Sequence, residues 1–296
     1  MQRAFLSAWG KLVWSLFFLA HSHLCAADRC PENLPQLQFS KLPLVIKNSL
    51  GAHDLLEPLN QATVLEREVK IYEYLQAGSM PDFLRRLKPI QIQESGHDLC
   101  FWVMPDYLSI GNDVDSVLLP LSFLTVAKLL KAWDFLLPTS KMVDAIYQQA
   151  DQVYWPRVYA PSQSMNSIET FIAHSDRIQA QDFGLLDKAR LVAGHKKDIV
   201  LSNRLLQRSN RIAIYGWQNL SAGENIQPLS ILHGERYVDY SHGVRLVAPW
   251  VWLDKQLVPL RQLLTDPILH SLLSREGPLA LDAILPRLSP ELAHHQ

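Results

Sequence analysis

The spacing of apolar residues changes near residue 182, and this change limits the folds open to the chain more than any other feature. Before it, apolar side chains recur every three or four residues, as between Thr63 and Gly78, a spacing typical of amphipathic helices. After it, short runs rich in β-branched and aromatic residues, such as 199–201 and 211–217, favour strands. We therefore predict an α+β fold in which a helical N-terminal half packs on a mainly antiparallel sheet formed by the C-terminal half.

Two consecutive helices are expected to form the packing centre of the N-terminal half. Ser122 can cap a nearly all-apolar helix that runs to Leu137, and Thr139 can cap a second helix over residues 141–150. Their aromatic and methionine side chains are expected to belong to the core.

Two further local patterns stand out. The runs 90–92 and 99–103 are joined across a polar stretch, 94–98, that contains a glycine, and this pattern predicts a β-hairpin. Near the end of the chain, two short helices are expected within 258–277, the second of them capped by Asp266.

The first 27 residues have the layout of a secretory signal peptide. Arg3 and Lys11 precede an uncharged apolar run over 12–20, and small residues at Ala26 and Ala27 suit a cleavage site. The apolar run is shorter than the roughly 20 residues that a membrane-spanning helix needs, and we expect no span in the mature chain. The chain is therefore predicted to be exported, to the periplasm or outside the cell, after cleavage near Ala27.

The rest of the chain is predicted to form one globular α+β domain with an N-terminal arm. Residues 28–60 carry four prolines and little periodicity, which indicates an extended arm. The domain itself covers residues 61–296. We divide it into a helix-rich part (61–181), a strand-rich part (182–257) and the C-terminal helices (258–277).

Cysteine content and charge limit the partners. Cleavage leaves Cys30 and Cys100, and an even pair in an oxidising compartment suggests a disulfide, although two unrelated buried thiols would fit the sequence as well. Cleavage also removes Arg3 and Lys11 from the 28 basic residues, which leaves 26 against 29 acidic ones, a net charge of −3. Nucleic acid is therefore not an expected partner. The oligomeric state is left open.

The stretch from His233 to Val247 concentrates the groups that could carry chemistry. If it is a strand, alternation places Tyr240 and His242 on an apolar face and Asp239 on the other. If the chain instead turns after Tyr240, Asp239 can meet His242 and orient its imidazole. The sequence allows both arrangements.

A second polar run, His195-Lys196-Lys197-Asp198, follows Gly194 between two apolar strand segments. A solvated turn is the alternative to a functional loop here. Tyr215 and Trp217 could stack on sugar rings. The predicted catalytic residues are His195, Asp198, His233, Asp239 and His242, and the predicted substrate-binding residues are Lys197, Tyr215, Trp217, Tyr240 and Arg245.

Histidines and aspartates can also bind zinc, but the spacing of His233, Asp239 and His242 matches no zinc motif. We therefore expect either no cofactor or a zinc ion, and no metal ligands are assigned. A serine triad is disfavoured, because no Gly-x-Ser-x-Gly motif is present.

The segment Ser241-His242-Gly243-Val244-Arg245-Leu246, with His233-Gly234 upstream, resembles a fragment of the active-site signature of L,D-transpeptidases, periplasmic enzymes that cross-link peptidoglycan. The family has a cysteine nucleophile directly after the glycine, where this chain has Val244, so the family's thioester chemistry is not expected. More broadly, Gly194 to Asp198, Tyr215-Gly216-Trp217, Val238 to Val247 and Glu276-Gly277 resemble a group of uncharacterised secreted bacterial proteins. This resemblance implies a bacterial envelope context and no particular reaction.

Two functions are compatible with these observations. The first is an exported hydrolase that acts on a cell-wall or extracellular polymer, a glycan or peptidoglycan, through the His and Asp residues named above. The second is a non-catalytic binding or accessory protein of the envelope, in which the same cluster is structural.

Overall fold

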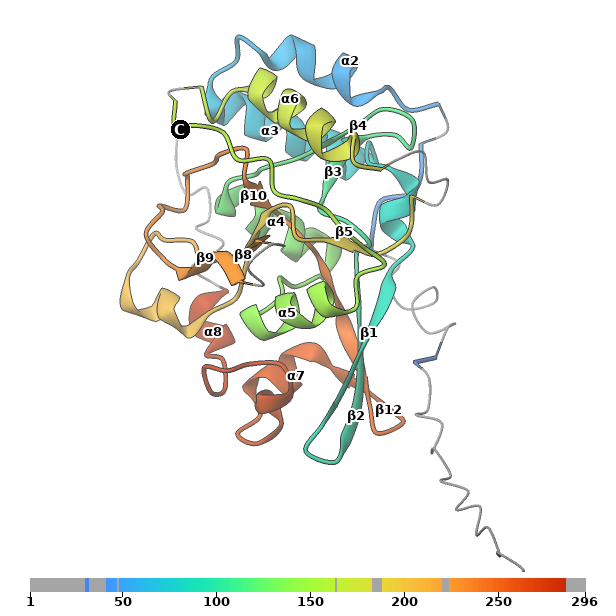
Figure 1. Cartoon of the computed structure of the whole chain (residues 1–296), viewed down its shortest axis with the longest axis vertical. Coiled ribbons are helices and arrows are strands. Elements are labelled where there is room, and N and C mark those ends of the chain that lie inside the picture. The colour runs from blue at the N-terminus through green and yellow to red at the C-terminus, as the bar shows by residue number, and fades with distance from the viewer. Residues whose placement is uncertain are drawn as a thin grey trace, which may run out of the picture.

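The computed structural model describes residues 30–31, 41–46, 48–162, 164–182, 188–219 and 224–285 (Figure 1). The predicted signal peptide, residues 1–27, lies outside this range. The helices are α2 (Ala52–Leu56), α3 (Val64–Ala77), α4 (Phe123–Trp133), α5 (Ser140–Gln148), α6 (Ile168–Gln179), α7 (Leu260–Thr265) and α8 (Leu281–Ile284). The short 3-10 helices are Glu57–Leu59, Asp82–Arg85, Asn203–Gln207 and Leu269–Leu272.

The strands form two four-stranded sheets and two small pairs. They are β1 (Lys88–Glu94), β2 (His97–Val103), β3 (Ser109–Gly111), β4 (Ser116–Leu118), β5 (Gln152–Val153), β6 (Val192–Ala193), β7 (Lys197–Ile199), β8 (Ile214–Asn219), β9 (Glu224–Ser230), β10 (His242–Gly243), β11 (Val247–Leu253) and β12 (Gln256–Pro259). The first sheet has the order β1-β2-β11-β12 and the second the order β10-β7-β8-β9, while β3 pairs with β4 and β5 with β6.

The first sheet is antiparallel throughout and is built on the predicted hairpin. Glu94 pairs with His97 across the turn, and Ser95 and Gly96 both have positive φ values, 53° and 81°, which suits a two-residue hairpin turn. From Leu99 onward every residue of β2 is buried. The hairpin prediction over 90–103 is therefore confirmed.

Helix starts follow the predicted capping residues. The Ser122 hydroxyl accepts a hydrogen bond from the backbone N–H of Thr125, and the Thr139 hydroxyl accepts one from Met142. The first of these helices ends earlier than Leu137, because Asp134 takes a left-handed conformation and Leu136 pairs through its backbone with a strand residue.

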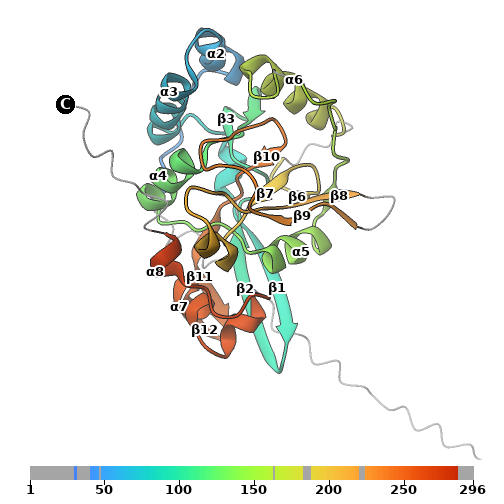
Figure 2. The ribbon, with the colours of Figure 1, turned by 90° about the vertical axis from the view of Figure 1, so that its left-hand side faces the viewer.

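The elements are arranged from one end of the molecule to the other. Helices α2, α3 and α6 gather at one end, the first sheet and α7 lie at the other, and the second sheet lies between them (Figures 1 and 2). One continuous cluster of buried apolar side chains extends from Ala52 to Ile284. Within the range that the structure describes, none of the helices has the length and apolar character needed to cross a lipid bilayer.

The predicted fold class is confirmed at the level of a mixed α+β fold with mainly antiparallel sheets. The finer division into a helical first half and a sheet from the second half is not confirmed. Strands β1 and β2 come from residues 88–103 and supply half of the first sheet. The apolar side chains of β2 that follow Leu99 are buried on both faces, so packing on both sides determines the position of this segment.

The predicted arm, residues 28–60, is not extended throughout. Its last part forms α2 and the 3-10 helix Glu57–Leu59. Ala52, Leu55 and Leu59 share one buried face at helical spacing. Pro58 is compatible with this turn because it lies in the first turn of the 3-10 helix, where a proline breaks no helical hydrogen bond.

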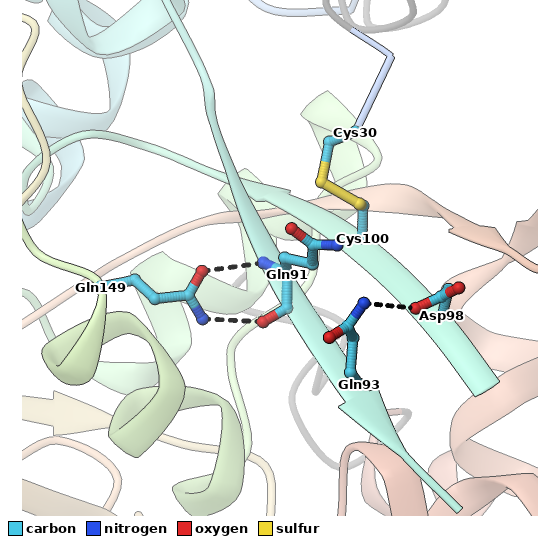
Figure 3. The surroundings of a disulfide bond; sticks show 6 residues. All are labelled: Cys30, Gln91, Gln93, Asp98, Cys100 and Gln149. Atoms are coloured by element: carbon cyan, nitrogen blue, oxygen red, sulfur yellow. Dashed lines mark hydrogen bonds between the residues drawn. A yellow bond between two sulfur atoms is a disulfide. The ribbon is translucent and has the colours of Figure 1, made fainter. Parts of the chain in front are cut away.

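A disulfide joins Cys30 to Cys100 of β2, with 5.8 Å between the two Cα atoms (Figure 3). The predicted pairing is confirmed. On the neighbouring edge strand β1, the side-chain amide of Gln149 accepts a hydrogen bond from the backbone N–H of Gln91 at 2.9 Å and donates one to its carbonyl at 2.8 Å (Figure 3). This contact satisfies backbone groups at the sheet edge, which would otherwise be open to another strand.

Replacement of both cysteines, Cys30→Ala with Cys100→Ala, should lower the free energy of unfolding by about 4 kcal/mol, because the bond closes a loop of 70 residues in the unfolded chain. Urea denaturation of the oxidised wild type and the double variant measures the difference. Reduced wild type should resemble the variant. Equal stability of all three forms would show that the bond does not stabilise the fold.

Candidate functional site

Two short parallel strands, β7 and β10, bring the two polar motifs of the sequence together. Lys197 pairs with His242, and Asp198 pairs with Gly243. A side chain at position 243 would not fit, because a Cβ atom there would lie 2.6 Å from Cδ1 of Tyr107. Neighbouring residues of β7 project to opposite faces, so the polar side chains form two groups. We call them the outer group (Lys197, His233, Tyr237, Asp239 and His242) and the inner group (Tyr107, Lys196, Asp198 and Arg245).

The carboxylate of Asp239 is the centre of the outer group. Its Oδ1 accepts hydrogen bonds from the backbone N–H of Ser241 at 2.7 Å and from the Ser241 hydroxyl, which closes an Asx turn. Its Oδ2 accepts one from the hydroxyl of Tyr237 at 3.1 Å and lies 3.9 Å from Nε2 of His242. Of the two arrangements that the sequence allows, the structure has the turn in which Asp239 meets His242.

Aromatic rings separate this carboxylate and imidazole from solvent. The rings of His233 and Tyr237 are stacked, with centroids 4.3 Å apart and 6° between their planes, and each lies at a steep angle to the ring of His242, 5.7 Å away. His242 is 0% exposed, whereas Tyr237 is 39% exposed, and His233 is partly exposed. The stacked pair therefore forms the surface of the outer group.

The pKa of each side chain in the outer group is shifted by its surroundings. Burial lowers the pKa of His242 to about 4, although Asp239 opposes the shift, and burial likewise lowers the pKa of His233. Burial and Asp239 raise the pKa of Tyr237 to about 12. Burial by itself would raise the pKa of Asp239, but His242 and the hydrogen bonds from Ser241 outweigh burial and hold that pKa below its usual value. At neutral pH the group therefore holds an anionic carboxylate beside neutral imidazoles.

The two residues predicted to stack on sugars are engaged with other parts of the protein. The ammonium of Lys197 lies 4.6 Å from the centroid of the Trp217 ring, a cation–π distance, and Trp217 is 5% exposed. The hydroxyl of Tyr215 donates a hydrogen bond to Asp144 at 2.9 Å. Gly216 and Trp217 both have positive φ, 102° and 58°, and the pairing of β8 shifts register between Ile214 and Gly216.

The inner group is built around the carboxyl of Asp198. The hydroxyl of Tyr107 donates a hydrogen bond to it at 2.7 Å, and the guanidinium of Arg245 lies 4.2 Å from the centroid of the Tyr107 ring. Arg245 is 1% exposed and donates to the backbone carbonyls of Met104 and Val192. Burial raises the pKa of Asp198 to about 7, although Arg245 and the Tyr107 hydrogen bond oppose the shift.

Lys196 connects the two groups to helix α6. Its ammonium donates to the backbone carbonyl of Tyr240 at 2.5 Å and lies 3.2 Å from Nδ1 of His174, a residue of α6. Burial lowers the pKa of Lys196 to about 7, although Asp239 and Asp106 oppose the shift. Burial and Lys196 lower the pKa of His174 to about 2, so this imidazole is neutral and can accept a hydrogen bond from the ammonium.

His195 lies on the side of the inner group. It is 0% exposed, its Nε2 is 3.2 Å from Oδ1 of Asp106, and its ring meets the rings of Tyr107 and Tyr154 edge-on at 4.9 and 5.4 Å. Within the part of the chain that the structure describes, neither of its ring nitrogens has a hydrogen-bond partner in good geometry.

The predicted site residues therefore do not surround a single cleft. The structure brings together His233, Asp239, His242 and Lys197 in the outer group, and it places His195, Asp198 and Arg245 on the inner side. Tyr240 is buried, and its hydroxyl accepts a hydrogen bond from the backbone N–H of Tyr159 at 2.8 Å.

Five residues of the site were not among the predicted site residues: Asp106, Tyr107, His174, Lys196 and Tyr237. One signal was available for His174, because it lies on the apolar face of α6 with Phe171 and Ile178. A histidine in such a position must pair with something in the core. No comparable signal marks Tyr107, because it follows β2 in a loop and reaches Asp198 from 91 residues away.

Space beside the inner group is small. A cavity of about 10 Å³ is lined by Tyr107, Lys196, Asp198, Arg245 and parts of α5 and β8, which is room for roughly one water molecule. Among the residues that the structure describes, no three His, Cys, Asp or Glu side chains converge in a way that would hold a metal ion.

Comparison with known proteins gives no relative: no protein-family description, no curated protein and no solved structure matches the chain. The geometry of the two groups is therefore the basis for any functional conclusion.

The buried carboxyl of Asp198 should make stability depend on pH. Its pKa is about 7 in the folded chain against 3.8 ordinarily, so between about pH 4 and 7 the folded state holds a proton that the unfolded state has lost. Stability conferred by this group therefore falls as pH rises through that window. Asp198→Asn keeps an acceptor for Tyr107 but does not titrate. Its stability relative to wild type should rise with pH by up to about 1.4 kcal/mol per unit.

Urea denaturation at several pH values measures this difference. The control is Asp54→Asn on α2, which removes a carboxyl that is exposed to water in the folded chain, and this variant should follow wild type. A difference between Asp198→Asn and wild type that stays constant from pH 4 to 7 would contradict the assignment.

Proposed function

We propose that the chain is an exported hydrolase of a cell-wall or extracellular polymer, a glycan or peptidoglycan, and that the outer group is its working site. The observation that carries the proposal is the Asp239 carboxylate, buried 3.9 Å from the imidazole of His242, with His233 and Lys197 beside it. Ionisable groups that share one environment and have perturbed titration are typical of catalytic sites.

The exposure of each member suggests its role. His233 is partly exposed and neutral at pH 7 because burial lowers its pKa, so it can accept a proton from an attacking water. Tyr237 is exposed beside it and is held by Asp239. Lys197 is the nearby cation that could stabilise negative charge on the reacting carbonyl or leaving group. In this proposal His242 and Asp239 position the exposed pair and do not touch substrate.

The inner residues would then be supporting residues. Asp198, Arg245 and His195 are each at most 3% exposed, and they hold β7 and the loop after β2 in place. Tyr240 fixes the turn that brings Asp239 to His242. Export is supported by the disulfide between Cys30 and Cys100, since such bonds persist in oxidising compartments, and by the signal-like first 27 residues.

A second candidate is a non-catalytic binding or accessory protein of the envelope. A specific observation favours it: Asp239 is 2% exposed and His242 0%, and the acceptor positions of Asp239 are taken by Ser241 and Tyr237 from its own loop. Such a turn can serve solely to fix the chain. The two candidates differ in whether His233 is needed for turnover.

Purified protein should release soluble fragments from peptidoglycan or a mixed polysaccharide preparation, and His233→Gln should reduce the rate about a hundredfold or more, the usual contribution of a general base. Because burial lowers the pKa of His233, the rate should rise with pH through a value below 6.5 and be level at pH 7. Fragment release measured against pH, by reducing-end or amine assay, tests both expectations.

The matched control is His97→Gln. His97 is also partly exposed and pairs with a carboxylate, Asp254, at 2.6 Å, but it lies on the distant β1–β2 hairpin. The His97→Gln variant should release fragments at the wild-type rate. No release from any polymer would favour the non-catalytic candidate, and release at equal rates by wild type and His233→Gln would show that His233 is not the general base.

A further inference from the structure

A polar cleft of about 170 Å³ lies between the β3–β4 pair and the end of α6, apart from the outer group. Its ionisable lining consists of Asp106, Tyr154, Asp182, Lys188 and Arg190. Its apolar lining includes Leu118, Ile178 and Val192, each at most 4% exposed. The cleft thus combines charges of both signs with an apolar wall.

Asp106 supplies a carboxylate that the protein itself only partly compensates. Its Oδ1 accepts a hydrogen bond from the backbone N–H of Tyr107 at 2.7 Å and lies 3.2 Å from Nε2 of His195. Two groups offset its charge in part: this histidine, which is charged only when protonated, and the buried Lys196, whose pKa Asp106 raises. The Asp106 side chain is 17% exposed, on the side of the cleft. A positively charged group entering the cleft would therefore find an acceptor.

The basic side of the cleft is preorganised. Arg190 donates a hydrogen bond to the hydroxyl of Tyr154 at 2.6 Å and forms an ion pair with Asp182, and its side chain is 11% exposed. Lys188 is exposed at the rim, where its ammonium donates to the carbonyl of Asp113 at 2.7 Å. Because Arg190 is fixed by its neighbours, it needs little reordering to meet an anion.

We propose that this cleft binds a small zwitterion of amino-acid size, with its ammonium group at Asp106 and its carboxylate at Lys188 and Arg190. The volume of 170 Å³, at about 10–15 Å³ for each water molecule, is room for roughly a dozen waters, so a free amino acid fits in the cleft with water beside it. The lining with two acidic and two basic side chains has no net charge, as expected for a ligand that carries one charge of each sign.

The apolar wall favours a ligand with a short aliphatic side chain. A methyl group placed against Leu118, Ile178 and Val192 would be removed from water, and glycine lacks this contact. Alanine should therefore bind more tightly than glycine. The proposal concerns binding alone and does not depend on the hydrolase proposed for the outer group.

Isothermal titration of the purified full chain tests the proposal with five probes: L-alanine, D-alanine, ethylamine, propionate and glucose. At least one alanine enantiomer should bind, and ethylamine and propionate, which each carry one of the two charges, should bind at least tenfold more weakly. Glucose should not bind. No binding of either alanine, or equal binding of ethylamine, propionate or glucose, would overturn the proposal.

Two variants place the ligand in this cleft. Asp106→Asn keeps the acceptor for the Tyr107 backbone but loses the charge, and Lys188→Gln changes an exposed rim residue that should not affect folding. Each should weaken alanine binding at least tenfold. The matched controls, Asp54→Asn and Lys70→Gln, change exposed residues of α2 and α3 and should bind as wild type does. Unchanged affinity in both cleft variants would show that the ligand binds elsewhere.

Discussion

The burial of the Lys196 ammonium is the constraint on which the surrounding structure depends. Lys196 is 1% exposed, and removing such a charge from water costs several kcal/mol unless other groups replace the water. The carbonyl of Tyr240 and the ring of His174 do so, and Asp239 and Asp106 contribute negative charge nearby. These four groups come from three distant parts of the chain, near residues 106, 174 and 240, so the packing of the lysine requires those parts to meet.

This requirement links the helical and strand-rich parts of the chain. His174 belongs to α6, Lys196 precedes β7, and Tyr240 precedes β10. The short parallel pairing of β7 with β10 is too small to hold two segments together by itself, because two residues give few hydrogen bonds. The polar contacts on both sides of the pair supply the rest. The inner group connects the β7–β10 pair to the loop after β2. The outer group lies between this pair and the surface, where His233 is partly exposed and Tyr237 is exposed.

Local signals in the sequence were sufficient for some parts of the fold. The hairpin over 90–103, the caps at Ser122 and Thr139 and the pairing of Cys30 with Cys100 depend on nearby residues or on a small number of options, and the structure has all of them. The helix at 52–56 was not predicted, because the four prolines of residues 28–60 indicated an extended arm. The place of β1 and β2 in a sheet with β11 could not be predicted, because a period of two residues does not identify the partner strand.

The candidate site shows the same limit. The sequence predicted candidate site residues at 233–247 and at 195–198. The structure brings these two segments together, but their side chains lie on two sides of β7. Alternation along a strand would have put Asp239 and His242 on opposite faces, and the Asx turn at Ser241 brings them to 3.9 Å instead. Tyr107 and His174 reach the site by contacts between distant segments, which no local pattern marks.

The imidazoles of His242 and His174 are both 0% exposed, and the arrangement of the residues around β7 and β10 depends on this burial. Nuclear magnetic resonance titration of ¹⁵N-labelled histidine side chains measures the protonation of both imidazoles in the folded protein. We expect His242 to stay neutral as pH falls until about pH 4 and His174 to stay neutral to about pH 2. Protonation of His242 and His174 near pH 6.5 in the folded protein would contradict this expectation.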